Sequence, residues 1–251
     1  MNGAKMLASR DISAGATRPV SIGDEVFATG KLVSSGGIVR LGAVGRGLYG
    51  KFLEDAGDIS VGTDLDPELA SDTLVTVRGI WADDTIRDSH VVELVDPIEM
   101  PEPFGDQIDS DLVPDGRFTK EEVVAPAVFE LTRGLGHEKL LFYSAHKLSD
   151  GWIGVACTTD SAAVEKALAR VLGNALAIVD VEWTAQDLEM IDEWVMGDKV
   201  GADLLSFGQG MNSAGQFRSY VLVRVITPET ASALAPVHPD ALLLTSWIQK
   251  S

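Results

Sequence analysis

Hydrophobic and polar residues alternate in short runs between residues 19 and 97, and turn-forming residues separate the runs. Alternation of this kind places hydrophobic side chains on one face of an extended segment, so it is typical of β-strands with one buried face. It predicts strands at residues 25–33, 38–44, 73–81 and 85–95. Residues 64–69 could form one helical turn, and residues 82–84 predict a hairpin between the last two strands.

The order of these elements resembles the OB-fold, a small five-stranded Greek-key barrel, on residues 74–81 and 85–94 with Gly36 and Gly37 before them. The resemblance implies a small β-barrel at residues 19–97. Many OB-folds bind oligonucleotides through basic grooves and stacked aromatic side chains. Acidic residues dominate here instead, and we interpret the few aromatic residues as core: Phe27, Tyr49, Phe52 and Trp81.

Proline and acidic residues take over after this region. Seven acidic residues, four prolines and no basic residue lie between Asp96 and Asp115. Proline keeps a chain extended, and like charges oppose its collapse. We therefore expect a linker at residues 98–117.

From residue 118 the pattern changes to strands that alternate with amphipathic helices, so residues 118–251 predict an α+β domain with a mixed sheet and three to four helices. Thr119 and Thr184 each precede an acidic residue by three positions, and Thr227 precedes a proline; all three patterns indicate helix starts. Pro126 must kink or restart the first helix. Hydrophobic spacing predicts a helix at residues 161–172 and strands at residues 139–147, 152–158 and 241–248.

Three segments share one order of elements, a strand followed by a capped helix: residues 153–172, 176–195 and 221–234. This similarity could reflect an internal repeat. It could equally reflect the general need for a capping residue wherever a strand leads into a helix.

The C-terminal half also resembles uncharacterised proteins of high-GC Gram-positive bacteria, on residues 150–157, 225–229 and 242–248. The resemblance implies a bacterial origin and no particular activity.

Net charge, the lengths of the apolar runs and the cysteine count limit what the protein could bind and where it could be located. The formal net charge is −18 and basic residues are scattered singly, so the chain would repel a phosphate backbone and nucleic-acid binding is not expected. No apolar run is long enough to span a bilayer, and residues 1–16 lack the apolar core of a secretory signal. The single cysteine excludes an intramolecular disulfide. We expect a cytoplasmic protein.

The candidate catalytic residues are few. His146 lies in a predicted strand near the turn that carries Asp150, and Cys157 lies in the partner strand, so a Cys–His nucleophile pair is conceivable. A small buried core residue is the simpler interpretation of Cys157. Asp180 and Glu182 alternate with hydrophobic residues and could bind Mg²⁺ or Ca²⁺, although a solvent-exposed strand face gives the same alternation.

Two glycine-rich segments could contact a ligand. Residues 42–50 lack the spacing of a phosphate-binding loop, and no other cofactor motif is present, so no cofactor is expected. Residues 206–216 are polar and rich in glycine, and we predict a loop that contacts a partner through Ser206, Gln209, Asn212 and Ser213.

These observations favour a non-catalytic protein that binds a protein partner as an accessory, scaffold or inhibitor, and the acidic charge could attract a basic partner. An enzyme of the hydrolase type, with a site assembled from the dispersed C-terminal residues, is the alternative. A third class, an oligosaccharide or nucleotide binder, would need exposed aromatic side chains on the barrel.

Overall fold

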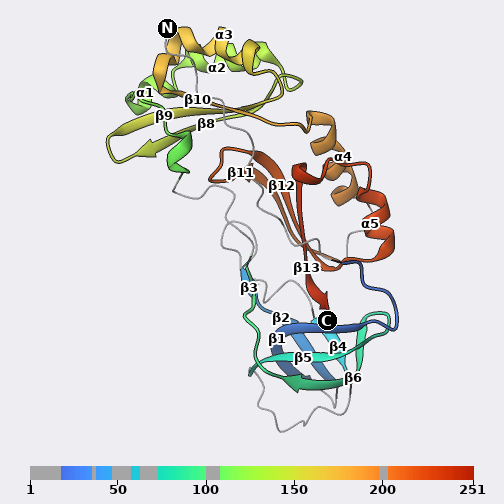
Figure 1. The fold of residues 1–251 in the computed structure, drawn as a ribbon. Coiled ribbons are helices and arrows are strands. Elements are labelled where there is room, and N and C mark those ends of the chain that lie inside the picture. Colours follow the sequence, from blue (N-terminus) through green and yellow to red (C-terminus); the bar gives the residue numbers. More distant parts are fainter. Residues whose placement is uncertain (1–17, 36–37, 47–57, 63–72, 100–107, 198–202) are drawn as a thin grey trace.

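The computed structural model describes residues 18–35, 38–46, 58–62, 73–99, 108–197 and 203–251. It is an α+β protein with a large mixed sheet and a second, smaller sheet. Figure 1 shows a ring of strands at one end, a sheet flanked by helices in the middle, and a further sheet with its own helices at the other end.

The N-terminal ring is built from five strands: β1 (Glu25–Ser35), β2 (Ile38–Ala43), β4 (Asp58–Val61), β5 (Leu74–Trp81) and β6 (Thr85–Val92). They pair in the order β1-β2-β4-β6-β5, and β5 pairs back onto β1. β4 and β6 are parallel, whereas the other neighbours are antiparallel. A separate two-residue pair joins β3 (Gly45–Arg46) to β7 (Ile98–Glu99).

Alternation explains why these segments are strands. Val75, Val77 and Trp81 of β5 are buried, as are Ile59 and Val61 of β4, and all of them belong to one hydrophobic cluster inside the ring. Burial of one face stabilises each strand against the conformational entropy of the chain. The predicted helical turn at residues 64–69 lies outside the described residues, as do Tyr49 and Phe52.

The C-terminal region consists of two units with the same order of elements. The first unit contains α2 (Pro126–Leu135), β8 (Leu140–Leu148), β9 (Gly151–Thr158), α3 (Ser161–Leu172) and β10 (Leu176–Asp180). The second unit contains α4 (Ala185–Met196), β11 (Leu204–Met211), β12 (Phe217–Val225), α5 (Pro228–Leu234) and β13 (Leu242–Lys250).

The pairing inside the two units is also the same. In each, the first two strands form an antiparallel hairpin, and the third strand is parallel to the second. Each hairpin carries a β-bulge near the start of its first strand, between Leu140 and Phe142 and between Leu204 and Ser206. A 3₁₀ turn with a buried alanine, Ala175 or Ala241, precedes each third strand. Of the three strand–helix segments that look alike in the sequence, two occupy the same position in the two units: β9 with α3, and β12 with α5. The third, β10 with α4, runs from the last strand of the first unit to the first helix of the second.

Local signals place the helices where the sequence predicts them. Capping boxes form at Thr119, before α1 (Lys120–Val123), and at Thr184, before α4. Pro126 restarts the chain as the first residue of α2. In both capping boxes the threonine side chain accepts a hydrogen bond from a backbone N–H group that has no partner within the helix.

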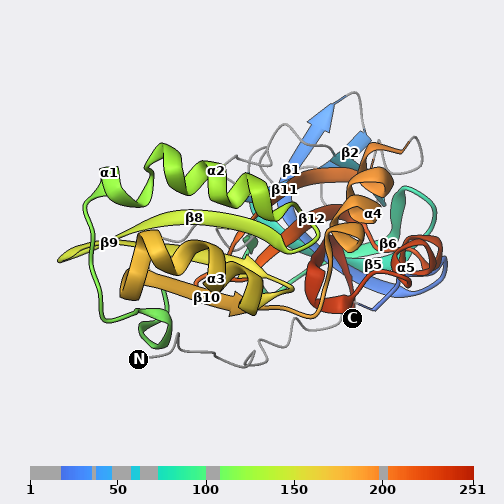
Figure 2. The ribbon, with the colours of Figure 1, turned by 90° about the horizontal axis from the view of Figure 1, so that it is seen from above.

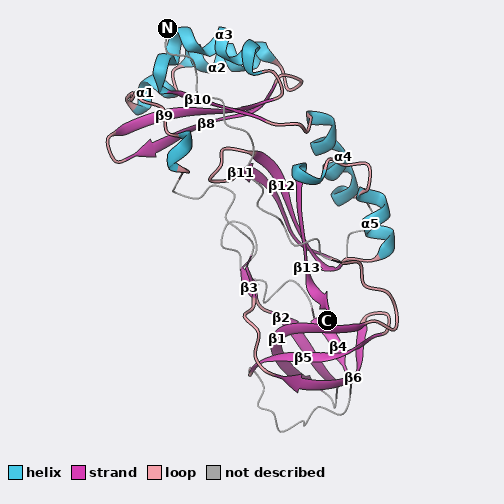
Figure 3. Cartoon of the chain, in the orientation of Figure 1, coloured by secondary structure: helices cyan, strands magenta, loops and turns pink. Residues whose placement is uncertain are grey.

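The second unit is continuous with the ring. The end of β13 pairs with the start of β1, matching Lys250 with Val26, so β11, β12 and β13 extend the sheet of the ring. Trp247 of β13 is buried in the ring's cluster, and its Nε1–H donates to the carbonyl oxygen of Thr29 over 2.8 Å. The N-terminal and C-terminal regions thus share one sheet (Figure 3) and part of one hydrophobic cluster.

Parts of the expected linker are packed against this framework. Ile98 and Glu99 form β7, and residues 110–112 form a 3₁₀ turn whose Leu112 is buried between the two units. Residues 100–107 lie outside the described residues. No helix in the described part of the chain has the length and apolar character needed to cross a bilayer.

The segment expected to be a loop at residues 206–216 is mostly a strand, and that prediction is wrong for residues 206–211. They belong to β11 and pair with β12 from Leu204 to Met211. Glycines weaken a strand in isolation, but pairing along a neighbouring strand satisfies their backbone groups and outweighs this preference.

Candidate functional site

An open groove lies between α2 and β8 at the edge of the first unit. Its volume is about 540 Å³. α2 contributes Phe129, Thr132 and Arg133, the following turn contributes Gly136 and His137, and β8 contributes its first four residues, Leu140 to Tyr143. Seen from above, α2 lies along β8 while α3 lies along β10 (Figure 2).

The amphipathic character of α2 explains why an aromatic side chain faces this groove. Val128 is fully buried in the cluster beneath α2 and α3, whereas the ring of its neighbour Phe129 is 52% exposed. A single exposed hydrophobic residue is common on protein surfaces. Phe129 differs because it lines a concave surface together with further apolar residues, which is typical of a binding site.

The outer side of β8 has no strand partner among the described residues. The first unit's sheet has the order β10-β9-β8, so β8 pairs with β9 on one side only. Edge strands are the usual places where a further segment pairs with a sheet. β8 contains no proline that would block such pairing, and its one charged residue, Lys147, lies near its far end.

Tyr143 lines the groove, and a hydrogen bond holds its side chain in place. Its hydroxyl donates to the carbonyl oxygen of Val123 over 2.9 Å, and its ring covers Gly154 on the neighbouring strand. Burial raises the pKa of the Tyr143 hydroxyl, so this group stays protonated and remains a donor. The hydrogen bond holds α1 against β8.

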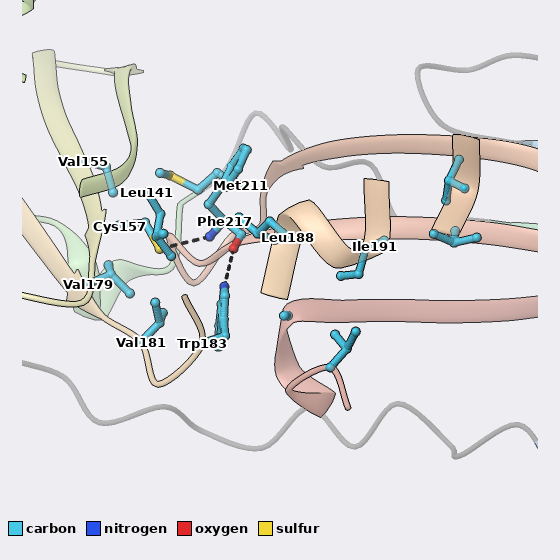
Figure 4. Close-up of a cluster of buried hydrophobic side chains, with 14 of the residues drawn as sticks. Leu141, Val155, Cys157, Val179, Val181, Trp183, Leu188, Ile191, Met211 and Phe217 are labelled. Carbon is cyan, nitrogen blue, oxygen red and sulfur yellow. Dashed lines mark hydrogen bonds between the residues drawn. The ribbon is translucent and has the colours of Figure 1, made fainter. Parts of the chain in front are cut away.

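Cys157 lies in the joint between the two units and away from solvent (Figure 4). Its Sγ accepts a hydrogen bond from the backbone N–H of Phe217 over 3.2 Å, and burial raises the pKa of the thiol to about 12. The same Phe217 accepts from Trp183 Nε1 at 2.8 Å and stacks on Phe142 with ring centroids 4.4 Å apart. A thiol that stays protonated is a poor nucleophile.

The structure does not bring His146, Asp150 and Cys157 together. Cys157 pairs with Phe142 across the hairpin, four residues from His146, which pairs with Ile153. Asp150 lies in the turn, where Arg117 Nε donates to it over 2.7 Å. That hydrogen bond from Arg117 lowers the pKa of the Asp150 carboxyl. Burial lowers the pKa of His146, which favours its neutral form.

Residues predicted to contact a partner make hydrogen bonds to other parts of the protein. Gln209 Nε2 donates to Asp192 Oδ1 on α4 over 2.9 Å, and Asn212 Nδ2 donates to Gln216 Oε1 over 3.1 Å. Ser213 accepts through its carbonyl oxygen from the backbone of Asp109. Ser206 lies within β11. Of the four, Asn212 and Ser213 lie in the turn between β11 and β12, where they help to order it.

Asp180 and Glu182 do not form a cluster with further ligands. Asp180 is the exposed last residue of β10, and Glu182 follows the strand with its side chain 91% exposed. Glu182 Oε2 lies 3.6 Å from His238 Nε2. Within the described ranges, no group of three or more histidine, cysteine or acidic residues has the arrangement of a metal site.

The aromatic residues of the ring are consistent with core positions where they are described. Trp81 is 5% exposed and Phe27 is half-buried.

No protein-family model matches the chain, and no curated protein matches it either. The resemblance of the C-terminal half to actinobacterial proteins therefore stays a prediction.

Sequence reasoning missed the groove. Its only local signal is Phe129, which lies beside Val128 and falls outside the hydrophobic stripe of α2. The other requirement is that α2 lies along an edge strand, and strand order within a sheet depends on contacts between distant segments.

Proposed function

We propose that this protein is a non-catalytic cytoplasmic protein that binds a protein partner through the groove between α2 and β8, acting as an accessory, scaffold or inhibitor. The observation that carries the proposal is the combination, in one place, of an apolar groove, an exposed Phe129 and β8, which is an edge strand within the described residues. Apolar surface that is concave and open to solvent is characteristic of interaction sites.

The charge of the chain supports a basic partner. A formal net charge of −18 attracts basic proteins over several ångströms and accelerates their association at low salt. The same charge repels nucleic acids, so it weighs against the oligonucleotide role of many OB-folds.

We assign an OB-like barrel to the N-terminal ring as part of this proposal. The strand order β1-β2-β4-β6-β5 with closure onto β1, and the parallel pairing of β4 with β6, support it. The buried Trp81 offers no stacking surface for a base or a sugar.

The alternative, a hydrolase-type enzyme, has weaker support. Its candidate nucleophile, Cys157, is fully buried, and His146 and Asp150 lie at other places along the β8–β9 hairpin.

The test is affinity capture from cells of the native host with three tagged proteins: the wild type, Phe129→Asp and Met196→Asp. Met196 is the matched control because it is an apolar helix residue that is 79% exposed and distant from the groove in sequence. We expect a partner that the wild type and Met196→Asp retain, that Phe129→Asp loses by about tenfold or more, and that high salt weakens.

Circular dichroism and a urea titration would show that both variants remain folded. Equal retention of the same proteins by all three baits, or retention of none at either salt concentration, would rule the proposal out.

A further inference from the structure

The exposed side of α2 carries one aromatic residue and two opposite charges. Phe129 is 52% exposed, and the side chains of Glu130 and Arg133 are 70% and 79% exposed. Arg133 follows Phe129 by four positions and Glu130 by three, so the three side chains lie on one side of the helix. Phe129 and Arg133 also line the groove.

Within one copy of the chain, the two charges hold each other only loosely. Arg133 Nη1 lies 3.4 Å from Glu130 Oε1. An ion pair that is so exposed contributes little to stability, because water screens it and both long side chains lose freedom when they form it. Both side chains are therefore able to turn towards another molecule at little cost.

The positions of these charges make the exposed side of α2 complementary to itself. Two copies of α2 can pack antiparallel around a two-fold axis that passes midway between Leu131 and Thr132. Glu130 of one copy then lies level with Arg133 of the other, because both residues are equally far from the axis. The symmetry produces this pair of opposite charges twice in each dimer.

The same arrangement brings an aromatic side chain to each groove. The two-fold axis keeps the groove sides of the two helices together. Phe129 of one copy therefore lies level with residues 133–136 of the second copy, of which Arg133 and Gly136 line the groove. α2 and α3 lie on the side of their sheet that faces away from the ring (Figure 1), so the ring does not lie between the two copies.

Net charge and helix length limit the strength of this association. Two copies with a net charge of −18 repel each other at low salt, whereas at physiological salt charges are largely screened beyond about 8 Å. A ten-residue helix is about 15 Å long, so one of its faces buries less than the roughly 800 Å² per partner that stable complexes bury. We therefore expect a weak and reversible dimer.

We infer that two copies of this chain associate through antiparallel α2 helices, with Glu130 of each copy paired with Arg133 of the other and Phe129 of each in the groove of the other. The dimer itself goes beyond the proposed function. Its regulatory consequence rests on that function: the second copy and the partner occupy the same groove, so self-association covers the apolar surface until the partner displaces it.

Sedimentation equilibrium of the full chain at about 0.15 M salt tests this inference. We expect the wild type to show a monomer–dimer equilibrium. Glu130→Arg and Arg133→Glu should each weaken the dimer by about tenfold or more, because each change turns both pairs into like charges. Phe129→Asp should weaken it at least as much, since it removes the aromatic side chain and adds a charge to an apolar groove.

Two controls carry the same kinds of substitution at distant exposed positions. Arg87→Glu changes an arginine in β6 of the ring, and Met196→Asp changes an apolar residue at the end of α4. Both should dimerise like the wild type. Circular dichroism and urea unfolding would show that every variant remains folded.

An equimolar mixture of Glu130→Arg and Arg133→Glu is the decisive measurement. In the mixed dimer every arginine at these positions meets a glutamate, so the mixture should dimerise within about threefold of the wild type. A mixture that dissociates like its separate components would overturn the inference. A wild type that stays monomeric at every concentration, or a dimer that Glu130→Arg leaves unchanged, would overturn it as well.

These outcomes are distinct from those of the capture experiment. If the wild type stays monomeric but captures a partner through Phe129, the proposed function stands and the dimer is refuted. If the mixture restores the dimer but capture does not depend on Phe129, the dimer stands and the proposed function fails.

Discussion

Gly215 lies where the second unit packs against the first. It lies in the turn between β11 and β12 with φ at +70°. A Cβ atom there would lie 2.7 Å from Val179 Cγ2 and 3.1 Å from Leu112 Cδ1. Glycine is therefore required here for two reasons: the backbone has a positive φ angle, and the neighbouring side chains leave no room for a Cβ atom.

Replacing Gly215 with alanine should destabilise the protein. A left-handed conformation costs an ordinary residue about 1 to 2 kcal/mol, and overpacking adds about 1 to 3 kcal/mol. Urea unfolding measures the change. Gly134→Ala is the control, because Gly134 is in α2 with nothing within 4 Å of its added Cβ, so alanine should stabilise by about 0.5 to 1 kcal/mol. Similar effects of the two substitutions would contradict the assigned role of Gly215.

His146 gives the stability of the protein a pH dependence of known sign. Burial lowers its folded-state pKa below the ordinary value of 6.5, so the unfolded chain takes up a proton more readily. The resulting stabilisation is fully present above about pH 6.5 and is lost as the pH falls through that value towards the folded-state pKa.

We expect His146→Gln to lose less stability than the wild type between pH 7 and pH 5, as measured by urea unfolding at each pH. His137→Gln, at an exposed histidine, should follow the wild type. A parallel pH dependence of the wild type and His146→Gln would show that other groups are responsible.

At the scale of the element, the hairpin between β5 and β6 carries strain that substitution can remove. Asp83 and Asp84 both adopt positive φ angles, 46° and 61°. Two-residue turns of this kind prefer Asn-Gly or Gly-Gly, because a Cβ atom disfavours this conformation. The Asp84 carboxylate lies 3.2 Å from Arg224 Nη1 in β12 and forms an ion pair with it.

Asp83→Gly should therefore stabilise the protein by about 0.5 to 1 kcal/mol in a thermal or urea titration. Asp84→Gly is the informative comparison. It relieves the same strain but removes the ion pair to Arg224, so its gain should be smaller. A loss of stability in Asp83→Gly would mean that the aspartate makes a favourable interaction in this turn.

At the scale of the molecule, the shared sheet links the C-terminal strand to the N-terminal ring. Trp247 is 3% exposed in the ring's cluster and bonds to Thr29, 218 residues away in sequence. Trp247→Ala should cost about 3 to 5 kcal/mol and should accelerate hydrogen exchange in β1 and β5 as well as in β13. Met196→Ala, at an exposed position, should leave exchange unchanged. Faster exchange confined to the second unit would show that the ring folds independently of it.

Sequence alone predicts most elements of the C-terminal region. The capping boxes at Thr119 and Thr184 and the hairpin around Asp150 all form where local residues indicate them. It does not predict β4, whose four residues are too few for a clear alternation, or β11, whose glycines favour a loop.

The local sequence therefore determined where helices begin and where turns occur, because caps and turns depend on residues within a few positions of one another. Only the tertiary structure decided that β1 pairs with β13, that the C-terminal region is two units of the same topology, and that Phe129 lines a groove beside β8. Those features arise from contacts between distant segments, whose stability depends on packing across the whole fold and not on the preferences of any one segment.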